Sequence, residues 1–166
     1  MPGTLVVPDV SVLLKWVLRS DDEEDRNRAL DLKAAWLAGS CQIVVPTLWA
    51  FEVGNVLGMK HAAAADGMLQ AMLDLEIPEE PPRGYTAEIF RLMRDYHVTC
   101  YDAAYHALAI LRGGTMLTAD RRYVRKAARA GHLRLLDDWR PTTWPGTGPR
   151  SRPRRPAVRD LSLCKL

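Results

Sequence analysis

The stretch TLVVPDVSVLLKWVL, residues 4–18, contains a strand, a junction and a helix within one short piece of chain. Thr4 to Val7 is an apolar run rich in β-branched residues, and it stops at Pro8-Asp9. Ser11 then opens an apolar segment long enough for about two helical turns. We therefore expect a short buried strand that leads directly into a helix, with Asp9 at the junction.

The rest of the chain repeats this alternation of short apolar strands and segments with helical periodicity. The expected strands are 4–7, 42–45, 115–118 and 133–136, and the expected helices after the first are 26–39, 47–65, 66–76, 85–96, 102–112 and 121–130. Such alternation is typical of a parallel sheet covered by helices. We predict an α/β protein, a three-layer α/β/α sandwich with a short parallel sheet of about four to five strands.

The helix expected at 47–65 contains an unusual acid. Thr47 can cap this helix, which is apolar almost all round and should therefore be buried. Glu52 lies inside it, with no lysine or arginine within one helical turn. Because a lone buried acid costs several kcal/mol unless it is paired or neutralised, Glu52 requires a partner.

Four carboxylates are placed where they can meet. Asp9 and Asp120 each follow an expected strand, and the carboxyl ends of parallel strands share one edge of a sheet. Glu52 lies one turn into its helix, and Asp102 lies in the first turn of the helix before the Asp120 strand. Clustered acids must take up protons or a cation, and oxygen ligands suit Mg²⁺ or Mn²⁺. The alternative, four unrelated caps and partly exposed acids, stays open on this argument alone.

Charge is distributed unevenly along the 166 residues, whose formal net charge is +3. Residues 141–166 hold six basic side chains and one acid, so the excess of positive charge lies at the C-terminal end. This segment is rich in Pro, Gly and Arg, a composition that buries too little apolar surface to fold. We predict one folded domain at 1–140 and a basic, Pro/Arg-rich, disordered tail at 141–166.

Cysteine, histidine and hydropathy patterns exclude several classes of protein. The three cysteines and four histidines show no disulfide or zinc-site spacing, so any metal would be held by oxygen. No uncharged apolar run approaches the roughly 18 residues that a membrane-spanning helix needs. No basic region precedes the first apolar stretch, as a secretory signal would require. We expect a soluble, cytoplasmic protein without a membrane partner.

Four segments resemble, in order and spacing, the acidic motifs of PIN-domain ribonucleases, especially the VapC-type toxins of bacterial and archaeal toxin–antitoxin pairs. The segments are VVPDVSVLLKWVL, PTLWAFEVGNVL, YDAAYHALAILRGG and TMLTADRRYV. The resemblance covers about residues 4–137, and it implies a PIN-like fold for the predicted sandwich.

The resemblance also implies an activity: Mg²⁺- or Mn²⁺-dependent hydrolysis of RNA phosphodiesters by an endoribonuclease, the toxin of a pair. Asp9, Glu52, Asp102 and Asp120 would then be the catalytic, metal-binding acids. A homodimer and a cognate antitoxin are the implied partners. Two alternatives are a PIN nuclease of RNA processing or turnover without an antitoxin, and a catalytically silent RNA-binding module.

Residues beside the acids have two interpretations each. Ser11 and Thr118 could orient a carboxylate or a water, or serve as ordinary caps. His106 lies one turn after Asp102 and is expected to pack or to support the acids rather than to act as a base. A cationic cluster could bind RNA phosphates or form a solvated helix face, and it comprises Arg121, Arg122, Arg125 and Lys126.

Two positions depart from the family pattern. Pro8 precedes the first acid, and Arg122 stands where some family members carry a further acid. The number of metal ions, one or two, is therefore left open by the sequence.

Overall fold

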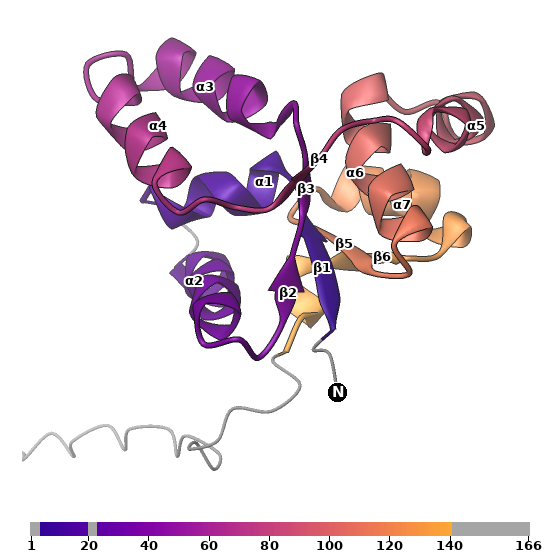
Figure 1. The fold of residues 1–166 in the computed structure, drawn as a ribbon, viewed down its shortest axis with the longest axis horizontal. Coiled ribbons are helices and arrows are strands. Elements are labelled where there is room, and N and C mark those ends of the chain that lie inside the picture. The colour runs from indigo at the N-terminus through magenta and orange to yellow at the C-terminus, as the bar shows by residue number, and fades with distance from the viewer. Residues whose placement is uncertain (1–3, 20–22, 141–166) are drawn as a thin grey trace, which may run out of the picture.

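The computed structural model describes residues 4–19 and 23–140 (Figure 1). Residues 141–166, for which we predicted a basic tail, lie outside the described residues, so that boundary stays a prediction.

A four-stranded sheet with all strands parallel forms the centre of the fold. Its order is β2-β1-β5-β6, in which β1 is Leu5–Pro8, β2 is Gln42–Ile43, β5 is Thr115–Thr118 and β6 is Leu133–Leu135. Val6 and Val7 of β1 and Met116 and Leu117 of β5 are buried, as short apolar strands covered by helices should be. The predicted α/β architecture with a short parallel sheet is confirmed.

The expected strand at 42–45 is divided between two sheets. Residues 42 and 43 pair with β1, whereas β3 (Val45–Pro46) pairs in parallel with β4 (Glu79–Glu80) in a separate two-stranded sheet. The backbone N–H of Val44 still donates to Val6 O over 3.2 Å, so the chain leaves the main sheet immediately after this residue.

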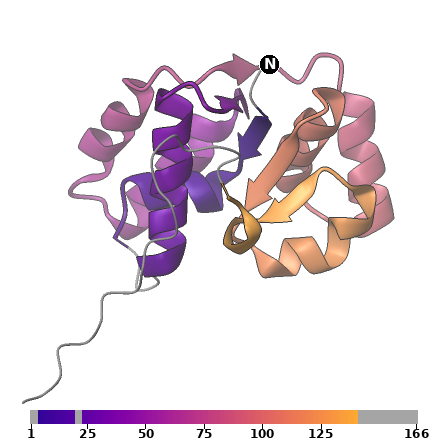
Figure 2. The same cartoon turned by 90° about the horizontal axis from the view of Figure 1, so that it is seen from below.

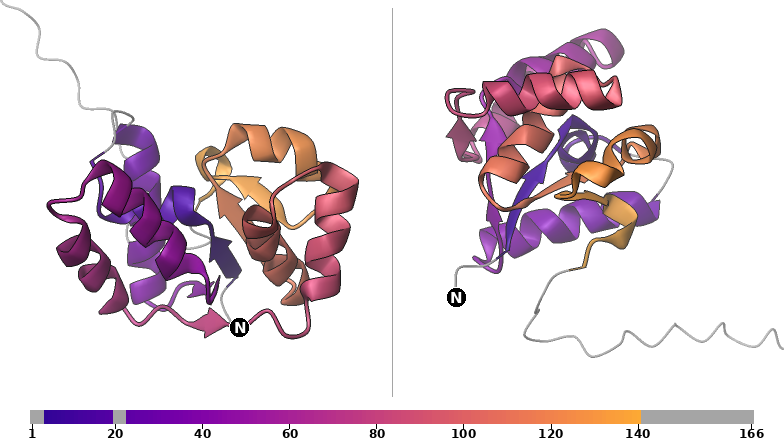
Figure 3. Two further views of the ribbon diagram at one scale, coloured as in Figure 1. Left: turned by 90° about the horizontal axis from the view of Figure 1, so that it is seen from above. Right: turned by 90° about the vertical axis from the view of Figure 1, so that its right-hand side faces the viewer.

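Helices lie on both faces of the sheet. The right-hand view of Figure 3 places α2 (Glu23–Leu37) below the sheet and α5 (Thr86–Tyr96) and α6 (Cys100–Leu111) above it. The side of α6 that packs on β1 and β5 is rich in alanine, and Ala103 and Ala107 are fully buried there. Small side chains allow the helix to approach the strands closely, which places the first turn of α6 beside the ends of the strands.

The remaining helices occupy the two ends of the molecule. Figures 1 and 2 show α1 (Val10–Leu13), α3 (Trp49–Lys60) and α4 (Ala65–Leu73) on one side, and α7 (Arg121–Ala127) with α5 on the other. Short 3₁₀ turns complete the fold at Leu14–Trp16, Ala128–Ala130 and Leu136–Asp138. None of the helices in the described part of the chain is long and apolar enough to cross a membrane.

The prediction that the helix around Glu52 is buried all round is wrong. Trp49, Val53 and Leu57 face the core, but Phe51 is 83% exposed and Met59 is 79% exposed. One side of α3 packs on the core, and a second side packs on α4. The side that carries Phe51 and Met59 is not covered by any described residue. The predicted cap is also wrong, because the helix begins after Leu48 without a side-chain cap and the Thr47 N–H donates to Glu80 O instead.

Candidate active site

Asp9 lies at the carboxyl end of β1, where the strand passes into α1. Its Oδ1 accepts hydrogen bonds from the Val12 N–H over 3.2 Å and from the Ser11 hydroxyl over 2.5 Å, and its Oδ2 accepts one from the Thr118 hydroxyl over 2.5 Å. The side chain is therefore both the N-cap of α1 and a buried carboxylate held through both oxygens.

The two hydroxyls are themselves oriented by the backbone that follows β5. The Ala119 N–H donates to Ser11 Oγ over 2.8 Å, and the Asp120 N–H donates to Thr118 Oγ1 over 3.0 Å. Each hydroxyl oxygen accepts a hydrogen bond from a backbone N–H and donates its own proton to Asp9. In both bonds to Asp9 the hydroxyl is therefore the donor and the carboxylate the acceptor. Ser11 and Thr118 thus both hold the Asp9 carboxylate in place.

Glu52 approaches the same region from α3. Its Oε2 accepts a hydrogen bond of 2.7 Å from the Tyr105 hydroxyl of α6. Burial and the nearby Glu52 charge raise the pKa of Tyr105, so it stays a protonated donor. Sequence reasoning did not assign Tyr105 a role, although it belongs to the quoted motif YDAAYHALA.

Asp102 is held at the first turn of α6 by Thr99. The Thr99 hydroxyl donates to Asp102 Oδ2 over 2.8 Å, and Thr99 Oγ1 accepts from the Asp102 N–H over 3.1 Å. The Thr99 side chain thus caps α6 and also orients the Asp102 carboxylate, three residues further along the chain. Thr99 was missed, although its spacing from Asp102 was visible in the sequence.

Three of the four acids act on one another electrostatically. Burial raises the pKa of Asp9 to about 6, the bonds from Ser11, Thr118 and Val12 oppose the rise, and the charge of Asp102 adds to it. Burial also raises the pKa of Glu52, against the bond from Tyr105, and the charges of Asp102 and Asp9 raise it further. Within residues 4–19 and 23–140, no lysine or arginine forms an ion pair with any of the four predicted acids.

Asp120 is exposed and is joined to the group less directly. It caps α7, because its Oδ1 accepts from the N–H groups of Arg122 over 2.7 Å and Tyr123 over 3.1 Å. Together with Asp102 it lines a pocket of about 200 Å³. Asp120 is therefore the N-cap of α7, and it also lies in the same pocket as Asp102.

The donor set agrees in chemistry with a hard divalent cation. All the candidate ligands are oxygens, and the charge of Asp102 raises the cost of ionising Asp9 and Glu52 without an ion-paired cation among the described residues to offset it. Across the part of the chain that the structure describes, no three His, Cys, Asp or Glu side chains are gathered closely enough to form a metal-binding group. The structure thus brings the acids to one neighbourhood but not into a closed cage.

Comparison with known families identifies the fold. The family model of the PIN domain matches residues 6–129, a span that contains all four acids. The chain belongs to the PIN domain family. PIN domains generally use divalent metal ions, in agreement with the oxygen-rich site.

Solved structures similar to this PIN domain share its fold at low sequence identity. PAE2754 from Pyrobaculum aerophilum has a TM-score of 0.59 at 20% identity, with 82% of this chain and 92% of that chain covered. VapBC2 from Rickettsia felis, bound to a DNA fragment from its promoter, has a TM-score of 0.58 at 14% identity, with 79% and 96% covered. Mycobacterium tuberculosis VapC20, described as a sarcin–ricin loop cleaving toxin, has a TM-score of 0.56 at 14% identity, with 76% of this chain and 95% of that chain covered. No curated protein matches the sequence.

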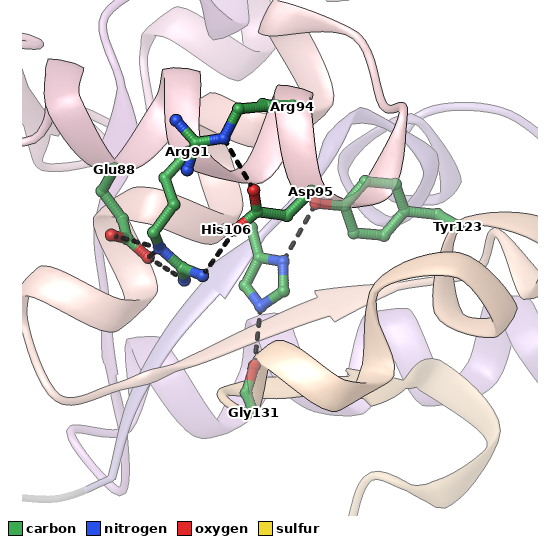
Figure 4. A network of polar contacts seen from close by, with 7 residues as sticks. All are labelled: Glu88, Arg91, Arg94, Asp95, His106, Tyr123 and Gly131. Carbon is green, nitrogen blue, oxygen red and sulfur yellow. Dashed lines mark hydrogen bonds and ion pairs between the residues drawn. The ribbon is translucent and has the colours of Figure 1, made fainter.

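His106 is a packing residue of this PIN domain. Figure 4 shows the imidazole between the Tyr123 hydroxyl, 3.0 Å from Nδ1, and the Gly131 carbonyl, 2.6 Å from Nε2. Since a carbonyl only accepts, Nε2 carries the proton and Nδ1 accepts from Tyr123. Burial lowers the pKa of this fully buried ring, and both nitrogens are engaged, so it has no capacity to serve as a base.

The predicted cationic cluster of the PIN domain divides into two parts. Arg122 and Lys126 line the pocket that contains Asp102 and Asp120, and Lys126 also donates to His97 O over 3.0 Å. Arg121 forms an ion pair with Asp137, and Arg125 is exposed but does not line the pocket. Only two of the four cations therefore flank the acids directly.

Proposed function

We propose that this PIN domain is a metal-dependent endoribonuclease that hydrolyses RNA phosphodiesters, and that it acts as the VapC-type toxin of a toxin–antitoxin pair. The observation that carries the proposal is Asp9, a buried carboxylate held through both oxygens at the end of β1, with the charges of Glu52 and Asp102 close by and no ion-pair partner among the described residues. The shared fold of VapBC2 and VapC20 supports the toxin assignment.

Asp9, Glu52 and Asp102 would hold Mg²⁺ or Mn²⁺, with Asp120 contributing from the neighbouring pocket. When bound, the ion supplies charge neutralisation at the phosphate and a lowered pKa for a coordinated water. The protein supplies orientation: each of these three acids is held by its own hydroxyl donor, from Thr118, Tyr105 and Thr99. Such preorganisation lowers the cost of ordering the carboxylates around an ion.

Arg122 and Lys126 would attract the anionic substrate. An RNA backbone approaches four acids only if nearby cations compensate the repulsion, and these two side chains line the pocket of Asp102 and Asp120. His106 takes no part in proton transfer, because its two ring nitrogens are occupied inside the fold.

The test is cleavage of transfer and messenger RNA by the purified full chain, with and without Mn²⁺. Asp9→Asn and Asp102→Asn are expected to abolish metal-dependent cleavage, whereas Asp31→Asn, which changes an exposed acid of α2, retains it. Circular dichroism and thermal unfolding establish that each variant is folded. Undiminished turnover in both active-site variants would overturn the assignment.

The same reagents separate the rival functions. A silent RNA-binding module draws support from the absence of a closed metal cage in the described residues, and it predicts RNA binding without cleavage at any Mn²⁺ concentration. A PIN nuclease without an antitoxin predicts cleavage but no toxicity on expression. Toxicity that is relieved by a small protein encoded beside this chain supports the toxin–antitoxin pair, for which we also propose a homodimeric toxin.

A further inference from the structure

A second hollow adjoins the acids through Glu52. It measures about 410 Å³ and is lined by Phe51, Glu52 and Asn55 of α3, Tyr101 of α6, and three aliphatic neighbours. Its volume lies within the range of about 300–1,000 Å³ that is usual for small-ligand pockets. Glu52 belongs to both the pocket wall and the acid group, so the pocket opens beside the proposed catalytic centre.

Two aromatic rings in this wall are left in solvent. Phe51 is 83% exposed and Tyr101 is 61% exposed, and they come from two different helices. Core packing accounts for neither ring, because the core side of α3 is formed by other residues and Tyr101 faces out from the first turn of α6. Exposed aromatics beside a polar site are typical of a binding surface rather than of a solvated helix face.

The backbone connects this pocket to the cationic one. Tyr101 lines the aromatic pocket, while the next residue, Asp102, lines the pocket of Arg122 and Lys126. Glu52 therefore belongs to a wall that suits a flat apolar ring, and Asp102 and Asp120 belong to a wall that suits a phosphate. A nucleotide chain carries these two kinds of group in the same alternation along its backbone.

We infer that the pocket between Phe51 and Tyr101 receives one unpaired base of a single-stranded RNA whose backbone passes the acids toward Arg122 and Lys126. The base stacks on the exposed rings, which is the usual means of holding splayed bases without strict sequence preference. The Asn55 amide, which both donates and accepts, is placed to contact a base edge. The inference rests on the proposed function in taking RNA as the ligand.

A base suits this site better than an apolar protein segment. An apolar side chain would desolvate Glu52 and Asn55 without returning hydrogen bonds, which carries a penalty, whereas a base edge offers donors and acceptors. Continuity with the cationic pocket also favours a polyanion over a neutral partner.

The experiment compares base-bearing and abasic strands. Fluorescein-labelled oligouridylate and oligoadenylate of about ten nucleotides, and an abasic ribose-phosphate strand of the same length, are titrated with the full chain in EDTA, where the strands stay intact. Phe51→Ala and Tyr101→Ala should each weaken binding of the base-bearing strands about tenfold and leave the abasic strand unaffected. Tyr101→Phe should bind like the wild type.

Two controls separate stacking from other effects. Phe90→Ala removes an aromatic ring of α5 that is also 61% exposed but lies outside the pocket, and it should change neither kind of binding. Lys126→Ala should weaken binding of both kinds of strand equally, because it removes a phosphate contact.

Three results would overturn the inference. The first is an equal loss of affinity for base-bearing and abasic strands, and the second is no loss of affinity in either aromatic variant. The third is a shift of the sedimentation coefficient in Phe51→Ala, which would assign the rings to a contact between protein chains. Failure of the proposed function has a different signature. In that case the wild-type protein cleaves no RNA with Mn²⁺, yet it binds base-bearing strands more tightly than the abasic strand. Phe51→Ala and Tyr101→Ala then abolish this difference in affinity.

Discussion

The Thr118 hydroxyl donates to Asp9 Oδ2 over 2.5 Å, although 109 positions separate the two residues in the chain. The parallel pairing of β1 with β5 makes this contact, because Pro8 is in register with Leu117 and the next residues of both strands emerge side by side. Pro8 is accommodated as the last residue of β1. The register of one strand pair thus determines the environment of the proposed central acid.

Thr118→Val should lower stability and metal affinity together. Valine keeps the shape of threonine but leaves Asp9 Oδ2 without its donor and the Asp120 N–H without its acceptor. Loss of partners for buried polar groups is expected to reduce the free energy of unfolding by about 1–3 kcal/mol, measured in urea, and to raise the Mn²⁺ concentration needed for cleavage. Thr86→Val, at the exposed start of α5, is the matched control. Equal unfolding midpoints for the two variants would contradict the role given to Thr118.

The stability of the metal-free protein should depend on pH through Asp9. Its pKa is about 6 in the folded chain against the ordinary aspartate value of 3.8, so the folded state binds this proton more tightly than the unfolded state. The corresponding stability is fully present below about pH 4 and is lost as the pH rises through about 6, a change of about 3 kcal/mol.

Asp9→Asn removes this titration, together with the influence of the Asp9 charge on the pKa of Glu52. The variant cannot ionise at this position, so the difference in free energy of unfolding between variant and wild type should grow in favour of the variant from pH 4 to pH 7. Chemical denaturation in EDTA at several pH values measures it. A difference independent of pH would show that Asp9 ionises normally.

Tyr105→Phe should affect catalysis through Glu52. Loss of the 2.7 Å bond removes a contribution that lowers the pKa of Glu52, so the acid limb of the pH–rate profile should move to higher pH. The expected loss of stability is about 1 kcal/mol. Tyr85→Phe is a close control, since it removes another buried tyrosine hydroxyl, one bonded to Glu80 O, and it should leave the pH–rate profile unchanged. A profile that moves equally in both variants would assign Tyr105 a purely structural role.

Arg122→Ala and Lys126→Ala should each reduce the salt dependence of RNA binding. Removing one cation that neutralises a phosphate lowers the slope of log K against log salt by roughly 0.7 for a single strand. Arg121→Ala should leave the slope unchanged, because this side chain is paired with Asp137. Fluorescence anisotropy at several salt concentrations tests all three, and a slope altered only by Arg121→Ala would reverse the assignment.

The strands and the order of the acids were predictable because both depend on local signals. Runs such as Thr115 to Thr118 are short and follow a Gly-Gly break, and an acid after such a run lies at the carboxyl edge whichever helices cover the sheet. The first turn of α6 was predictable for the same reason, since Asp102 opens a periodic apolar segment.

Prediction was wrong or incomplete where a residue's role depends on distant neighbours. The apolar composition of α3 predicts burial on all sides, but the neighbouring elements leave Phe51 in solvent. The hydroxyl that holds Glu52 was missed because only the tertiary fold brings Tyr105 of α6 to this acid, across 53 positions of the chain.

The sequence by itself determined the alternation of strands and helices, the four acids and their family, because these follow from composition and spacing within a few residues. Only the tertiary structure decided that Thr118 orients Asp9, that Tyr105 holds Glu52, and that Arg121 pairs away from the site. The physical reason is range: local propensity acts within a turn or a strand, whereas these contacts depend on strand register and helix packing between remote segments.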